Sequence, residues 1–145
     1  MVSKIKIICI GKIKEKSIKD FSDEITKRIK PFCNFEIIEL KDRGLEEDTN
    51  NLILKIKEEK SKNIFIMDEK GCEYTSLGFS DLIKNTEEEI VFIIGGADGL
   101  SKNIKQNNKN ICLSKMTFTH EMARMFLIEQ IYRSMMIINN KKYHK

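Results

Sequence analysis

The chain has 145 residues, of which 41% are hydrophobic and 33% are charged, and its net charge is +4 at pH 7. This length suits one domain with a single core, and the composition excludes a disordered or membrane-embedded chain. The longest purely apolar run, residues 90–94, is far shorter than the roughly 20 residues of a membrane span, and the N-terminus lacks a signal-peptide pattern. We therefore expect one cytoplasmic domain over residues 1–145.

The first half of the chain alternates between strand and helix patterns. Residues 4–10 are rich in β-branched residues and predict a strand. Apolar residues at spacings of three and four over residues 18–32 predict an amphipathic helix, which Pro31 stops. Residues 35–40 predict a second strand, and residues 52–56 mark a helix in a charged segment that ends near residue 60.

The next segment contains the pattern of a sheet centre. Residues 63–68 predict a third strand, followed by a turn at residues 69–71. Ser76 is placed to cap a short helix. Residues 90–94 are apolar on both faces, which is typical of a central strand in a parallel sheet.

A short helix with Leu100 and Ile104, a strand over residues 110–113 and a long final helix capped by Thr119 complete the pattern. The final helix has a broad apolar face, which serves either the core or a second subunit. Strands that alternate with helices indicate an α/β fold with a mostly parallel sheet flanked by helices.

Two segments lie where an α/β sheet binds ligands, at the carboxyl ends of its strands. One is the glycine loop, residues 95–99, which matches no phosphate-loop or dinucleotide pattern and is therefore either a ligand wall or a tight turn. The other is segment 113–118, which forms either a second wall of the same pocket or a plain loop.

Metal chemistry finds no support in the sequence. The four cysteines (Cys9, Cys33, Cys72 and Cys112) are far apart, contain no C-x-x-C pair and are expected to be structural thiols, most of them in apolar surroundings. The dipeptide His120-Glu121 starts a zinc-like H-E-x-x-H motif, but Arg124 stands where the second histidine belongs. We expect no metal site.

The C-terminus concentrates groups that suit RNA. Arginine is scarce, yet Arg124 and Arg133 both fall in the final helix, where a guanidinium could bind phosphate or form an ordinary ion pair such as Glu129 with Arg133. Tyr143 and His144 could stack on bases, or the terminal histidine could simply be solvated.

These pieces together resemble the ribosomal RNA large subunit methyltransferase H family, a group of small SPOUT-type enzymes. The resemblance covers essentially the whole chain and is carried by four segments in order: residues 92–100, 113–120, 127–133 and 143–145, with the opening residues 10–16 in agreement. Thr119 departs from the family pattern, which often has proline before the histidine.

The resemblance implies a deep C-terminal trefoil knot, a homodimer with its pockets near the subunit interface, and S-adenosyl-L-methionine as the cofactor. It implies methyl transfer to N3 of a pseudouridine, position 1915 of 23S rRNA, on the assembled ribosome. The cofactor contacts carried over by position are Met67, Gly95, Leu113, Ser114, Lys115, Met116, Thr117 and Phe118.

The expected catalytic group lies towards the C-terminus. His144 is the candidate base or base-orienting group, because N3–H must lose its proton. Arg124 and Arg133 are expected to steady phosphates or developing charge, and Tyr143 to stack on the flipped base. Two other functions remain open: a flavodoxin-like domain that binds a nucleotide or flavin without methyl transfer, and a non-catalytic ribosome-binding module.

Overall fold

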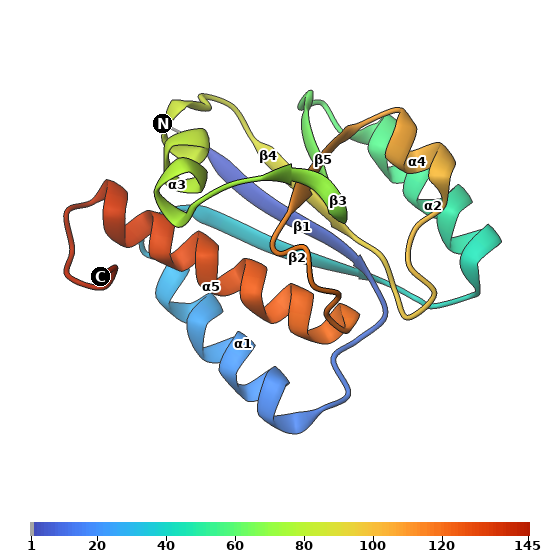
Figure 1. Ribbon diagram of the computed structural model, residues 1–145, viewed down its shortest axis with the longest axis horizontal. Coiled ribbons are helices and arrows are strands. Elements are labelled where there is room, and N and C mark those ends of the chain that lie inside the picture. The colour runs from blue at the N-terminus through green and yellow to red at the C-terminus, as the bar shows by residue number, and fades with distance from the viewer. Residues whose placement is uncertain (1) are drawn as a thin grey trace.

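The computed structural model describes residues 2–145 and shows one parallel five-stranded sheet between two layers of helices (Figure 1). The strand order is β2-β1-β4-β3-β5, and every neighbouring pair is parallel. The predicted α/β class and parallel sheet are confirmed. The strands are β1 (Lys4–Ile10), β2 (Asn34–Leu40), β3 (Asn63–Glu73), β4 (Ile90–Ile94) and β5 (Lys109–Cys112). The helices are α1 (Lys16–Ile29), α2 (Leu45–Glu58), α3 (Ser76–Asn85), α4 (Lys102–Gln106) and α5 (His120–Ile138).

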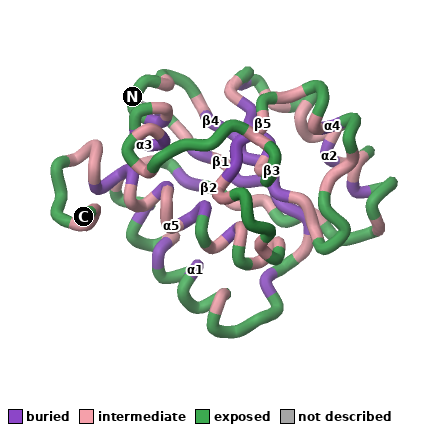
Figure 2. Tube along the Cα trace, in the orientation of Figure 1, coloured by how far each residue is buried: buried purple, intermediate pink, exposed green. Residues whose placement is uncertain are grey.

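Strand β4 is the centre of the sheet, as its apolar sequence predicts. All five of its residues are buried, because helices cover both faces of the sheet. On one face α1, α3 and α5 enclose the larger core, and on the other α2 and α4 cover a smaller one. Figure 2 shows the buried residues gathered along the sheet and on the inner sides of these helices.

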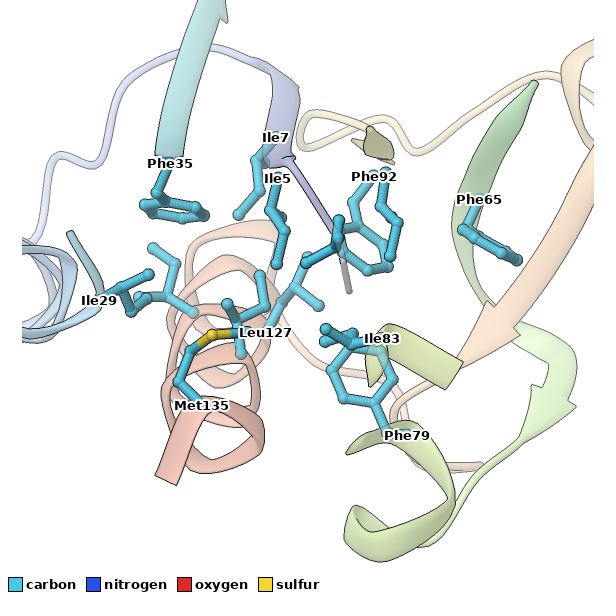
Figure 3. Packing of buried hydrophobic residues seen from close by; sticks show 14 of the residues in the cluster. Ile5, Ile7, Ile29, Phe35, Phe65, Phe79, Ile83, Phe92, Leu127 and Met135 are labelled. Carbon is cyan, nitrogen blue, oxygen red and sulfur yellow. The ribbon is translucent and has the colours of Figure 1, made fainter. Parts of the chain in front are cut away.

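Phe92 of β4 is the largest fully buried side chain and lies at the middle of the larger core (Figure 3). Its ring centroid is 5.9 Å from that of Phe65 on β3 and 5.8 Å from that of Phe79 on α3. These tilted contacts join two strands and a helix around one aromatic ring.

The turn predicted at residues 69–71 is wrong, because β3 continues through it to Glu73. The pairing of β3 with β5 shifts register between Met67 and Cys72, so the intervening residues bulge out of the ladder. Gly71 is explained by close approach: a Cβ atom there would lie 2.6 Å from the backbone carbonyl carbon of Asn110.

Two of the predicted helix starts differ from the structure, and one agrees. Thr119 caps α5, since its hydroxyl accepts a hydrogen bond from the Met122 amide at 3.2 Å. The cap of α3 is Thr75 and not Ser76, whose hydroxyl donates instead to Gln130 of α5 at 2.8 Å. Leu100 lies outside α4, which begins at Lys102 after the cap Ser101.

The broad apolar face of α5 mostly serves the core, since the helix packs between α1 and α3. Met122 and Phe126 remain 41% and 38% exposed near its start. None of the helices in residues 2–145 is long and apolar enough to cross a membrane.

The four thiols are all free, but they differ in burial. Cys9 and Cys112 are buried as expected, whereas Cys72 is exposed. Burial raises the pKa of the Cys9 and Cys33 thiols to about 11, which keeps both protonated and unreactive at neutral pH.

We predict that Phe92→Ala lowers the free energy of unfolding by about 3–5 kcal/mol, because it empties the point where β3, β4 and α3 meet. Urea denaturation followed by circular dichroism measures this loss. The control is Leu54→Ala on α2, whose side chain is 57% exposed, and it should change the stability by no more than about 0.5 kcal/mol. Equal losses in the two variants would contradict the central place given to Phe92.

Candidate functional site

A cavity of about 420 Å³ opens at the carboxyl ends of β3, β4 and β5, where parallel sheets bind ligands. Three loops and the start of α5 form its walls. Its lining residues are Met67, Asp68, Glu69, Ile94, Gly95, Gly96, Ala97, Gly99, Leu100, Lys105, Leu113, Ser114, Met116, Thr117, Phe118, Thr119, His120 and Ala123.

The glycine loop is both a tight turn and a wall of this cavity. Gly99 adopts a φ of +74° and its amide donates to the Gly96 carbonyl at 3.0 Å, which closes the turn. A Cβ atom at Gly95 would lie 2.7 Å from the Gly99 carbonyl oxygen, so this position accepts only glycine without rearrangement. The loop therefore presents backbone to the cavity.

Segment 113–118 forms the facing wall, and five of its six residues line the cavity. The Ser114 hydroxyl accepts from the Met116 amide at 3.0 Å, and Phe118 packs edge-on against Phe126 with ring centroids 5.0 Å apart. Lys115 is the exception: its side chain is 82% exposed and pairs with Glu73 at 3.2 Å.

Met67 and two carboxylates reach the cavity from the bulge of β3. Met67 was expected there from the resemblance, whereas Asp68 and Glu69 were not expected. The available signal was their position at the carboxyl end of a predicted strand, since Asp68 is the last residue of that strand and Glu69 follows it. Asp68 pairs with Lys105 of α4 at 3.5 Å.

The start of α5 completes the cavity with His120 and Ala123. The next residue, Glu121, accepts hydrogen bonds from the amides of Lys14 and Glu15 at 2.9 and 3.0 Å, which ties the β1–α1 loop to α5.

Arg124 does not line the main cavity. It is buried and its Nη2 donates to Glu39 of β2 at 2.8 Å, in a much smaller hollow that also touches Gly95 and His120. The ion pair connects α5 to the edge strand behind the glycine loop. Arg124 and Gly95 of the glycine loop thus line the same hollow, and the role expected for Arg124 in steadying phosphate or developing charge stays a prediction.

Arg133, Tyr143 and His144 form a separate cluster on the C-terminal half of α5, organised by Glu129. The Arg133 guanidinium donates to Glu129 at 2.6 Å, and the Tyr143 hydroxyl donates to the same carboxylate oxygen at 3.0 Å. The Tyr143 ring also packs edge-on against the Tyr132 ring, with 4.8 Å between the ring centroids. The guanidinium carbon of Arg133 lies 4.9 Å from the centroid of the Tyr143 ring. The ion pair with Glu129, one of the two alternatives for Arg133, is therefore present, and the tail folds back on the helix.

The protonation of this cluster follows from its partners. Nη1 of Arg133 lies 3.1 Å from Nδ1 of His144. Because a guanidinium has only donors, this contact is a hydrogen bond in the tautomer whose Nδ1 accepts and whose proton is on Nε2. Burial and the hydrogen bond to Glu129 raise the pKa of Tyr143, so its hydroxyl stays protonated.

The two groups of expected site residues are far apart within one chain. Arg133 lies about 20 Å along α5 from His120, at about 1.5 Å per residue. Figure 1 shows the C-terminal tail at the opposite end of α5 from the loops that form the cavity. Within residues 2–145, no three His, Cys, Asp or Glu side chains are grouped as a metal site.

Known proteins are similar to this chain in sequence or in fold. A protein of Clostridium perfringens named ribosomal RNA large subunit methyltransferase H 1 is 40% identical over 157 aligned positions, which cover 97% of this chain and 99% of the relative. A protein of Fusobacterium nucleatum named ribosomal RNA large subunit methyltransferase H is 40% identical over 154 aligned positions, which cover 97% of this chain and 99% of the relative.

Among solved structures, ribosomal RNA small subunit methyltransferase E from Neisseria gonorrhoeae, bound to S-adenosyl methionine, superimposes with a TM-score of 0.58. It is 14% identical, and the match covers 94% of this chain and 66% of that one, so the likeness concerns the fold alone.

The family described as predicted SPOUT methyltransferase matches residues 3–144. The chain therefore belongs to the SPOUT methyltransferases and, within them, to the ribosomal RNA large subunit methyltransferase H family.

Proposed function

We propose that this enzyme transfers a methyl group from S-adenosyl-L-methionine to N3 of a pseudouridine in 23S rRNA, on the assembled ribosome. The observation that carries the proposal is the backbone-lined cavity at the carboxyl ends of β3, β4 and β5, in a chain that belongs to this methyltransferase family.

The residues around the cavity fit such a cofactor. Its volume lies in the range of small-molecule sites. Met67, Leu113 and Phe118 offer apolar contact for a purine, and the glycine loop offers backbone groups for its polar edges. When bound, the cofactor supplies an electrophilic methyl group. The chain's part is to hold and orient the reactants.

His144 is proposed to act on the base that receives the methyl group. With Nδ1 engaged by Arg133, its Nε2–H is a donor suited to a carbonyl of the pyrimidine. This favours the base-orienting role over the role of proton acceptor. Arg133 and the lysines of the tail are proposed to bind phosphate, because Glu129 satisfies only part of the guanidinium fork.

A single chain does not bring the tail to its own cavity, so we propose a homodimer in which the tail of one protomer serves the cavity of the other. The large side chains that remain exposed near the cavity, Met116, Met122 and Phe126, support an interface at this end of α5. The knotted C-terminal region that the resemblance implies stays a prediction.

We predict that radiolabelled methyl groups pass from S-adenosylmethionine to ribosomes isolated from a strain that lacks this enzyme. Mass spectrometry should locate the label on one pseudouridine of the large-subunit rRNA. Transfer to naked 23S rRNA should be much slower, because a domain this small is expected to recognise an assembled surface.

Absence of label on ribosomes, free large subunits and naked rRNA alike would contradict the proposed activity. Binding of flavin mononucleotide in place of S-adenosylhomocysteine would favour a flavodoxin-like domain. RNA affinity that falls with salt, without any cofactor affinity, would favour a binding module.

We further predict that two inactive variants restore each other. Gly95→Ala should abolish cofactor binding, because its Cβ atom clashes with the Gly99 carbonyl. His144→Ala should keep cofactor binding but slow methyl transfer by about 100-fold. The whole co-expressed population should regain about a quarter of the wild-type activity, because about half of its dimers are mixed and each of these holds one intact site of two.

A tail that acts on its own protomer would give no such recovery, since neither protomer of the mixed dimer would then be complete. Full turnover in the His144→Ala homodimer would remove the histidine from the mechanism. Calorimetry with S-adenosylhomocysteine and a thermal melt on each variant serve as controls for binding and folding.

A further inference from the structure

The charged side chains on the cavity wall do not cancel. The wall contains two carboxylates, Asp68 and Glu69, and one lysine, Lys105, besides the imidazole of His120. Lys105 pairs with Asp68, whose side chain is only 8% exposed. Lys105 thus neutralises the Asp68 carboxylate, and the net charge of the wall depends on Glu69.

Glu69 has no cation as a partner. Across residues 2–145, no lysine, arginine or histidine forms a salt bridge with it. Lys115, on the facing segment, is already paired with Glu73. The cavity wall therefore carries one uncompensated negative charge.

Glu69 is nevertheless held in place at the junction of two walls. Its carboxylate accepts a hydrogen bond from the Thr117 hydroxyl of segment 113–118. Its backbone carbonyl accepts one from the Cys112 thiol of β5, with 3.2 Å between sulfur and oxygen. Glu69, although exposed, is thus anchored both by its side chain and by its backbone, and the bulge of β3 presents its carboxylate to the cavity.

We propose that Glu69 is a specificity-determining residue that makes the cavity prefer the charged methyl donor to the discharged product. This inference rests on the proposed function, because it takes S-adenosylmethionine and S-adenosylhomocysteine as the two ligands. Transfer of the methyl group leaves the carbon–sulfur bonding pair on sulfur, so the sulfonium becomes a neutral thioether. The two ligands differ by one methyl group and one positive charge, and an uncompensated carboxylate distinguishes them by that charge.

The consequence is faster exchange of product for donor. An attraction between unit charges near a protein surface corresponds to an affinity difference of several-fold to about tenfold at moderate salt. Asp68 contributes little to this preference, because Lys105 already neutralises it. Loss of the sulfonium charge removes the attraction after each turnover, which weakens product inhibition.

The test is Glu69→Gln, which keeps the size of the side chain and its ability to accept from Thr117 while removing the charge. Calorimetry on the full-length protein measures the Kd of S-adenosylmethionine and of S-adenosylhomocysteine. We expect the variant to bind the donor several-fold more weakly and the product with unchanged affinity. The Kd of the product divided by the Kd of the donor should therefore fall by the same factor. Added salt should reduce this ratio in the wild type and leave it unchanged in the variant.

A matched control is Glu24→Gln, which removes an exposed carboxylate of α1 that pairs with Arg28 and does not line the cavity. Its ratio of Kd values should equal that of the wild type. Sinefungin, which carries a protonated amine in place of the methylsulfonium group, should lose affinity in Glu69→Gln as the donor does. This separates recognition of charge from recognition of the methyl group.

Equal weakening of donor and product in Glu69→Gln would overturn the proposal, because the carboxylate would then bind a group common to both, such as the ribose hydroxyls. An unchanged ratio would overturn it as well. If the wild-type protein binds neither ligand, the proposed function itself fails, and that result is distinct from both of these.

Discussion

Burial of β4 on both faces is the constraint on which the rest of the structure depends. A parallel strand whose five residues are all apolar must be covered from both sides, so helices occupy both faces and the connections gather at the two ends of the sheet. At the carboxyl end the chain leaves β4 directly into the glycine loop. The same packing that forms the core therefore also places a backbone-lined turn at the edge where the cavity opens, which is the edge where parallel sheets usually bind ligands.

Helix α5 connects the two parts of the site without joining them within one chain. Its first turn lines the cavity with His120 and Ala123, and its second half holds the tail through Glu129 and Arg133. The fixed rise of the helix keeps His120 and Arg133 about 20 Å apart. This separation is the physical reason to expect a second subunit, and it makes the dimer part of the proposed chemistry.

Charge in the site is mostly compensated by neighbours. Arg124 is paired with Glu39 behind the glycine loop, Lys105 with Asp68 on the cavity wall, and Arg133 with Glu129 at the tail. Buried or half-buried charges need such partners, because desolvation is costly. Glu69 is exposed and differs in that the Thr117 hydroxyl holds it while no salt bridge among the described residues neutralises it, which is why it is the residue proposed to sense the charge of the ligand.

The sequence by itself determined the features that depend on local chemistry. The apolar run 90–94 indicated the central strand, and Pro31 indicated the end of the first helix. Thr119 indicated the start of the final helix, and the four-segment resemblance indicated the family. Only the tertiary structure decided the rest. The bulge of β3 and the glycine at position 71 follow from contact with β5, the ion pair of Arg124 follows from contact with β2, and the exclusion of Lys115 from the cavity follows from Glu73. Each of these is set by a partner distant along the chain, and neither propensity nor periodicity identifies such a partner.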